Sequence, residues 1–223
     1  METGDLSNWR APLAPPDDLG LEGRYVRLEP FDPARHANPI HARAEAHPEI
    51  WDYMLDGPHA DGVAYGAAIT QLGAPPDINF FALYSKDLGD FGGHASFLRI
   101  NPTHGSIELG HILLTPSLRQ SRAATEAWAL MMGWAFEAGY RRFEWKCNAL
   151  NASSCRAAER LGFTFEGIHR QALVAKGKNR DTAWYSVIDS EAPRVLGALD
   201  RWLAPENFDE DGLQRQPLRA FQS

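Results

Sequence analysis

Polar and hydrophobic residues alternate along several stretches of the chain, a pattern typical of half-buried β-strands. Short apolar runs bounded by turn residues predict strands in the same way. Turns are expected at 86–93 and 176–180. The predicted strands are 23–31, 78–85, 94–101, 106–114, 141–147, 164–175 and 181–189.

Elsewhere the apolar residues recur every three or four positions, which predicts amphipathic helices. The clearest stripe covers 124–138 and is followed by Gly139, a plausible C-terminal cap. Two further helices are expected, over 152–161 and 191–203. Residues 34–74 mix two or three short helical patterns, with breaks expected at the three prolines of this region, Pro39, Pro48 and Pro58.

This order of elements predicts an α/β (α+β) fold with a mixed central sheet of about seven strands flanked by helices. The strand–helix–strand step over 106–147 favours a parallel pair with a right-handed crossover. We expect one domain over 22–203, preceded by a proline-containing arm (1–21) and followed by a polar tail (204–223).

Composition narrows the class of protein. The 223 residues carry a net charge of −7, which argues against a general nucleic-acid binder. No stretch approaches the roughly 18 apolar residues of a membrane span, and the N-terminus has no apolar signal core. The two cysteines form no C-x-x-C and the eight histidines form no metal-ligand pattern. We therefore expect a reduced, cytoplasmic protein without a metal or a membrane contact.

The segment LRQSRAA (118–124) puts two arginines, Arg119 and Arg122, immediately before a predicted helix. A helix N-terminus is already electropositive and binds phosphate readily, so the pair indicates a site for an anion such as a diphosphate. Ser121 could cap the helix or donate to an oxygen. The alternative is an ordinary helix start with solvated arginines.

Four segments in sequence order resemble the GNAT superfamily of N-acetyltransferases, in its ribosomal-protein N-terminal acetyltransferase branch. They are the strand IELGHILL, the loop RQSRAATEA, the helix segment NALNASSCRAAERLGFTFEG and the closing strand NRDTAWYSVID. The resemblance covers roughly residues 22–190. It implies the GNAT fold and transfer of an acetyl group from acetyl-CoA to a primary amine, by direct attack in a ternary complex. No metal takes part in the implied reaction.

The resemblance also implies which residues bind acetyl-CoA. Backbone groups of the strand before the loop would hold the pantetheine arm, loop N–H groups the pyrophosphate, and Asn151 the pantetheine again. The implied residues are Ile112, Leu113, Leu114, Arg119, Gln120, Ser121, Arg122, Ala123, Ala124, Asn151 and Ser154. Arg122 replaces the central glycine of the family motif, so its guanidinium would point outward and could reach a phosphate such as the 3′-phosphate of CoA.

Two catalytic residues follow from the same resemblance. Glu108 stands where the family's strand carries a glutamate and could act as the base, through water. Ser154 stands where the branch has a serine near the CoA sulfur and could protonate or solvate the thiolate. His111 is the other candidate base, but residues three apart on a strand face opposite sides unless a bulge intervenes. Asn151 could instead simply cap the helix that follows it.

Other residues keep alternative interpretations. Arg180 and Asp181 could line the acceptor pocket or form a turn, and three aromatic residues could wall that pocket or belong to the core. Cys155 is expected to be structural rather than nucleophilic, because nothing marks it as activated. The aromatic residues are Trp145, Trp184 and Tyr185.

The sequence leaves two functions open. One is the acetyltransferase, whose acceptor could be a protein N-terminus or a small amine, including an antibiotic or an amino-acid analogue; the net charge mildly favours a cationic acceptor. The other is a non-catalytic module that binds CoA or a protein. The arm and the tail could serve a homodimer contact. A nucleotide-binding enzyme is disfavoured, because neither G-x-x-x-x-G-K-[ST] nor G-x-G-x-x-G occurs.

Overall fold

The computed structural model describes residues 5–222, which form a mixed eight-stranded sheet in the order β1-β2-β3-β4-β5-β6-β8-β7. Strands β5 and β6 run parallel, and the other neighbouring pairs run antiparallel. The strands are β1 (Leu21–Glu22), β2 (Val26–Pro30), β3 (Asn79–Ser85), β4 (Asp90–Asn101), β5 (Ser106–Leu114), β6 (Arg142–Asn148), β7 (Thr164–Ala175) and β8 (Lys178–Ile188).

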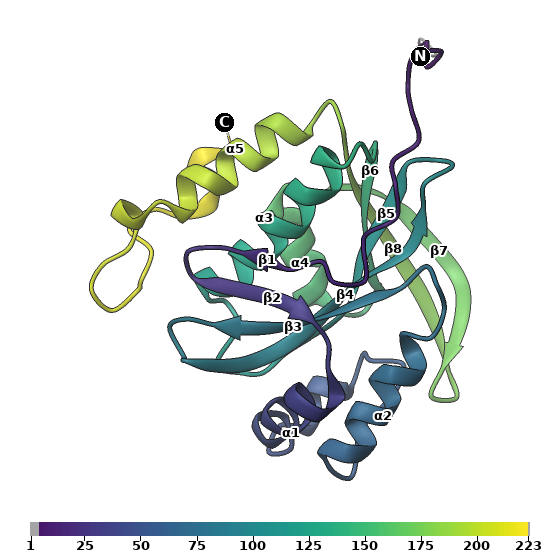
Figure 1. Cartoon of the computed structure of the whole chain (residues 1–223), viewed down its shortest axis with the longest axis vertical. Coiled ribbons are helices and arrows are strands. Elements are labelled where there is room, and N and C mark those ends of the chain that lie inside the picture. The colour runs from purple at the N-terminus through teal and green to yellow at the C-terminus, as the bar shows by residue number, and fades with distance from the viewer. Residues whose placement is uncertain (1–4, 223) are drawn as a thin grey trace.

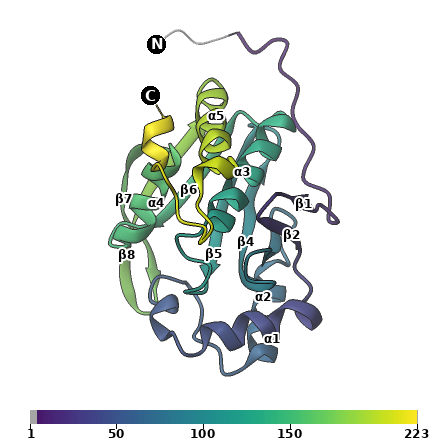
Figure 2. The ribbon, with the colours of Figure 1, turned by 90° about the vertical axis from the view of Figure 1, so that its left-hand side faces the viewer.

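Helices cover both faces of this sheet (Figure 1). One face carries α1 (Pro33–Ala44) and α2 (Gly62–Leu72), which enclose a core cluster around Tyr65 and Trp51. The opposite face carries α3, α4 and α5, which enclose the larger cluster, and Figure 2 shows the sheet between the two helical layers. These three helices are α3 (Arg122–Glu137), α4 (Ala152–Leu161) and α5 (Ala192–Leu203).

Short 3₁₀ helices lie at Pro48–Trp51, Pro205–Asn207 and Leu218–Phe221. The last two belong to the C-terminal segment, where Phe208 and Leu218 are buried in the larger core cluster. In the N-terminal segment the carbonyl of Leu13 accepts a hydrogen bond from Tyr140. Residues 1–4 and 223, the outer ends of the predicted arm and tail, lie outside the described residues. Within 5–222 no helix is long and apolar enough to cross a membrane.

The predicted mixed sheet flanked by helices is confirmed, with the two-residue β1 beyond the seven expected strands. The stretch 23–31 was wrong as a single strand. Only Val26–Pro30 pair as β2, and residues 23–25 form the turn after β1, closed by a hydrogen bond from the N–H of Gly23 to the carbonyl of Val26. The N–H groups of Arg24, Tyr25 and Val26 donate to the carboxylate of Glu126. Pro39 does not break α1, which begins at an Asp32 cap and continues to Ala44.

Two predicted turns were too long. Strand β4 begins at Asp90, inside the predicted turn 86–93. A Cβ on Gly93 would lie 2.2 Å from the carbonyl oxygen of Leu113, so the glycine allows close strand approach there rather than a turn. Strand β8 begins at Lys178, which leaves only Lys176 and Gly177 at the hairpin tip.

The parallel pair separates partway along its length. Pairing of β5 with β6 runs from Ser106↔Arg142 to Leu109↔Trp145 and stops there, although β5 continues to Leu114. Beyond this point β6 stays paired with β8, and β5 stays paired with β4. The two central strands are thus unpaired beyond Leu109 and Trp145, and we call the region between these unpaired strand ends the cleft. The loop that leads into α3 begins where β5 ends.

Candidate active site

The cleft exposes one edge of β5. On its other side β5 is paired with β4, through Gly93↔Leu114 and His94↔Leu113. Within residues 5–222 no strand pairs with the cleft-side edge beyond Leu109. The main chain of Ile112, Leu113 and Leu114 therefore borders the cleft, where an extended ligand could add to the sheet by hydrogen bonding along the edge.

The loop after β5 presents free main-chain donors. Ser121 caps α3, since its Oγ accepts a hydrogen bond from the N–H of Ala124 at 3.0 Å. The preceding Gln120 has a φ of 58°, a left-handed conformation that turns the chain into the helix. In the described part of the chain, the N–H groups of Gln120, Arg122 and Ala123 have no hydrogen-bond acceptor. Three such donors at the positive end of a 16-residue helix are suited to bind an anion.

The two arginine side chains of this loop are already engaged. The Arg122 guanidinium binds Asp87 through two hydrogen bonds of 2.8 Å and lies 4.2 Å above the ring centroid of Tyr25. Nε of Arg119 donates to the carbonyl of Leu114 at 3.2 Å. The contribution that remains open to Arg122 is its N–H group, rather than the outward-pointing guanidinium expected from the sequence.

Helix α4 begins beside the same cleft. Asn151 caps this helix: its Oδ1 accepts from the N–H of Ser154 at 3.1 Å. The Oγ of Ser154 accepts a hydrogen bond from Nε1 of Trp145 at 3.0 Å. Below it, the Sγ atoms of Cys147 and Cys155 are 3.5 Å apart, and burial raises the pKa of Cys147 to about 12. A thiol with that pKa is a poor nucleophile, in keeping with a structural role for the pair.

A bulge in β5 brings the two candidate bases, Glu108 and His111, to the same face of the sheet. His111 has a φ of 45°, and the pairing with β4 shifts by one residue between Ser96↔Gly110 and His94↔Leu113. The extra residue resets the alternation, so His111 lies on the α1–α2 side of the sheet together with Glu108. Its ring stacks on Phe80, with 5.2 Å between centroids.

Glu108 is buried between two cations. Its Oε2 lies 2.6 Å from Nε of Arg99 and 3.1 Å from Nζ of Lys146. Burial raises the pKa of Glu108, while Lys146 and Arg99 act in the opposite direction. Arg99 itself sits on a second bulge, with a φ of 47°, and also binds Glu144. The carboxylate is therefore held in place by a buried ion-pair network.

His111 is the less constrained titratable group. Burial lowers its pKa, and the charges of Lys146 and Arg180 lower it further against the opposing effect of Asp56. The ring is therefore neutral near pH 7. Its Nδ1 is buried without a hydrogen-bond partner among residues 5–222. A neutral imidazole with a free ring nitrogen can accept a proton.

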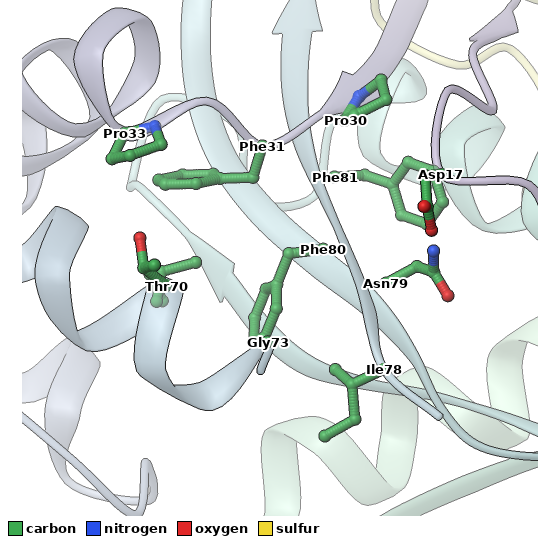
Figure 3. A pocket seen from close by; sticks show the side chains of 11 residues that line it. Asp17, Pro30, Phe31, Pro33, Thr70, Gly73, Ile78, Asn79, Phe80 and Phe81 are labelled. Atoms are coloured by element: carbon green, nitrogen blue, oxygen red, sulfur yellow. The ribbon is translucent and has the colours of Figure 1, made fainter. Parts of the chain in front are cut away.

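A surface pocket lies next to this face but not in the cleft (Figure 3). It is lined mainly by apolar side chains of the β2–α1 connection, the end of α2 and β3, among them Phe31 and Phe80. Phe80 also stacks on His111, so the pocket and the cleft share that ring. The chemistry-bearing residues are in the cleft.

The remaining predicted residues separate into three groups. Trp145 and Tyr185 are core residues on the α4 side. Asp181 stabilises the β7–β8 hairpin, because its Oδ1 accepts from the N–H of Gln171 and from Asn179. Arg180 and Trp184 lie on the cleft side of β8. Sequence reasoning missed Arg99 and Lys146, although the alternating charges of β6, at Arg142, Glu144 and Lys146, signalled a polar face.

The family-model comparison matches residues 26–164 to the acetyltransferase (GNAT) domain. Among solved structures, a GCN5-related N-acetyltransferase from Brucella melitensis is 42% identical over 97% of this chain and 99% of that one, with a TM-score of 0.92. A GNAT-family acetyltransferase from Chromobacterium violaceum is 37% identical over 86% and 96% of the two chains, with a TM-score of 0.81.

More distant structures share the fold alone. An acetyltransferase from Salmonella typhimurium is 20% identical over 74% of this chain and 96% of that one, with a TM-score of 0.63. No curated protein sequence matched the chain. The family model covers more than half of the chain, and the first two structures extend the similarity over nearly all of it. The chain belongs to the GNAT acetyltransferase family.

Proposed function

We propose that this protein is an acetyl-CoA-dependent N-acetyltransferase that transfers the acetyl group to a primary amine by direct attack in a ternary complex. One observation carries the proposal: the cleft between β5 and β6 lies beside three N–H groups, at and just before the start of α3, that have no acceptor within residues 5–222. GNAT acetyltransferases use acetyl-CoA, and the arrangement offers both an edge for an extended arm and a site for a diphosphate.

The residues present suit acetyl-CoA. The N–H groups of Gln120, Arg122 and Ala123 are placed to bind the pyrophosphate, and the edge of β5 at 112–114 to bind the pantetheine arm. Ala124 would join them if its N–H left the Ser121 cap. When bound, acetyl-CoA supplies an activated thioester.

The reaction joins the amine nitrogen to the acetyl carbon and breaks the carbon–sulfur bond. One proton must leave the amine and one must reach the thiolate. We assign the first transfer to the face that carries Glu108 and His111, with Glu108 acting through water because two cations hold its carboxylate. Ser154, at the start of α4, is the donor proposed for the thiolate.

Two kinds of amine are candidate acceptors. The Salmonella typhimurium structure is described as an enzyme that modifies the N-terminal serine of 50S ribosomal subunit protein L7/L12. At 20% identity that likeness shows the fold, so the ribosomal-protein branch rests on the sequence motifs. A protein N-terminus and a small amine are therefore both candidates. The cytoplasmic location and the homodimer stay predictions.

A thermal melt with acetyl-CoA tests the proposal. At about 100 times the dissociation constant, one-site binding stabilises the folded state by about 2.7 kcal/mol. For a chain of this size the midpoint should rise by roughly 5–10 °C. Thiol release with a panel of amines then tests turnover. A shift without release from any amine would support the non-catalytic module, and no shift would refute acetyl-CoA binding.

A further inference from the structure

Three side chains on one face of β8 carry buried polar atoms without partners. Arg180, Thr182 and Trp184 occupy alternate positions, so their side chains share a face of the strand. In residues 5–222, Nε of Arg180, Oγ1 of Thr182 and Nε1 of Trp184 are buried and make no hydrogen bond. Buried polar groups in folded proteins are nearly always satisfied, so three neighbours left open indicate a ligand.

All three groups can donate a hydrogen bond. Arg180 is also charged, and it forms none of the ion pairs found in the described chain. Arg142 on the neighbouring strand β6 and Arg99 on β4 each bind two carboxylates instead. A half-buried guanidinium without a carboxylate, beside a hydroxyl and an indole N–H, is suited to bind a carboxylate from outside.

This donor group lies at the acceptor side of the cleft. Trp184 is paired with Lys146 across β6 and β8, and Nζ of Lys146 lies 4.5 Å from the centroid of the indole. Lys146 in turn contacts Glu108. The charge of Arg180 also lowers the pKa of His111. An anion held by β8 would thus be near the two candidate bases.

The surroundings favour a small acceptor. The segment between α1 and α2 is tied to both walls of the cleft: Tyr53 donates to the carbonyl of Leu150 at 3.0 Å, and Lys176 donates to the carbonyl of Trp51 at 2.8 Å. These contacts join it to the start of α4 and to the tip of the β7–β8 hairpin, which lies beside the α1–α2 layer in Figure 1. A compact ligand can occupy a site enclosed in this way more readily than a protein chain.

We propose that the acceptor is a small aminocarboxylate, such as an α-amino acid or a close analogue, whose carboxylate is bound by Arg180, Thr182 and Trp184. This inference rests on the proposed acetyltransferase function. It makes the acceptor site selective for a carboxylate next to the amine, which neither a simple alkylamine nor an amino-acid amide offers.

The test compares the standard L-α-amino acids with their carboxamides as acceptors, by thiol release. We expect kcat/KM for the best amino acid to exceed that for its amide by about 30-fold or more, because the amide cannot form the charge-assisted contacts. Arg180→Gln should abolish this preference, because it should lower kcat/KM for the amino acid far more than kcat/KM for its amide. Arg170→Gln removes the same charge from an exposed position on the same hairpin and should keep the preference.

A second readout needs no turnover. The N-acetylated amino acid alone should raise the melting midpoint of the wild type and of Arg170→Gln, but not of Arg180→Gln, and its amide should raise none of them. Equal rates for acids and amides, or equal slowing of both by Arg180→Gln, would overturn the carboxylate site. So would a panel in which no amino acid is acetylated and no N-acetyl amino acid shifts the melt. Absence of thiol release from every amine, with the carboxylate-dependent shift intact, would overturn the transferase function alone.

Discussion

The carboxylate of Glu126 connects α3 to the start of β2 and gives a sharp stability prediction. Its Oε1 accepts from the N–H of Arg24 at 2.8 Å, and its Oε2 from Tyr25 at 2.6 Å and Val26 at 2.9 Å. Gly23 completes the site, because a Cβ there would lie 2.4 Å from Oε2. Three main-chain donors thus depend on one buried carboxylate.

Glu126→Gln keeps the shape of the side chain and removes its charge. The amide oxygen can still accept two of the bonds, but each falls from a charge-assisted to a neutral bond, a loss of about 1 kcal/mol. The amide nitrogen faces the third N–H, donor against donor, which forfeits a bond worth about 1.5–3 kcal/mol. Since Arg24 is only partly buried and can turn to water, the expected total is about 3 kcal/mol.

Urea unfolding followed by tryptophan fluorescence measures this difference. The transition midpoint should fall with an unchanged m-value, and the melting midpoint should drop by roughly 6–12 °C. Glu137→Gln is the matched control, since this glutamate is exposed on the last turn of the same helix and its variant should lie within about 0.5 kcal/mol of wild type. A loss below about 1 kcal/mol in Glu126→Gln would refute the role assigned to the carboxylate.

Three further predictions concern the cleft and its surroundings. Burial lowers the pKa of His94 to about 3 from 6.5. Between these two pH values the unfolded chain binds a proton at this residue and the folded chain does not, so stability falls as the pH drops. From pH 7 to pH 5 the wild type should lose about 2 kcal/mol more than His94→Gln in urea titrations, and parallel curves would contradict the assignment. Glu108→Gln should retain the melt shift with acetyl-CoA and lose about 100-fold in turnover; unchanged turnover would remove Glu108 from the mechanism. Arg122→Ala should leave the ratio of the CoA and dephospho-CoA affinities unchanged, because Asp87 holds the guanidinium, whereas a loss confined to CoA would assign it to the 3′-phosphate.

Local patterns predicted most of the fold because most of its elements are locally consistent. Strand β7 agrees with its predicted bounds. Ser121 caps the start of α3 and Gly162 caps the end of α4, as their residue types indicate. The start of the stretch 23–31 shows where a local pattern falls short. Residues 23–25 form the turn between β1 and β2, and Glu126, about 100 residues away, binds the N–H groups of Tyr25 and Val26. Nothing in the local pattern of apolar and polar residues reports such a partner.

The part of the proposed site that would bind acetyl-CoA follows more directly from the sequence than the part that would bind the acceptor, for a physical reason. Phosphate binding by main-chain N–H groups needs only a strand, a tight loop and a helix start, and this geometry follows from local sequence. The ion pair of Arg122 with Asp87 and its contact with Tyr25 could not be predicted, because these partners come from other elements. The proposed role of the main chain depends instead on where the helix begins.

The acceptor half depends on backbone shifts that the sequence does not show. Arg99 and His111 are not glycines, yet both adopt positive φ values at bulges, one in β4 and one in β5. Each bulge adds one residue to the alternation and so moves a side chain from one face of the sheet to the other. Strict alternation would have separated His111 from Glu108, and the bulge instead brings both to the face where β8 presents its unpaired donors. The chemistry of the acceptor therefore depends on how β4 and β5 pair, which is a property of the assembled sheet rather than of either strand.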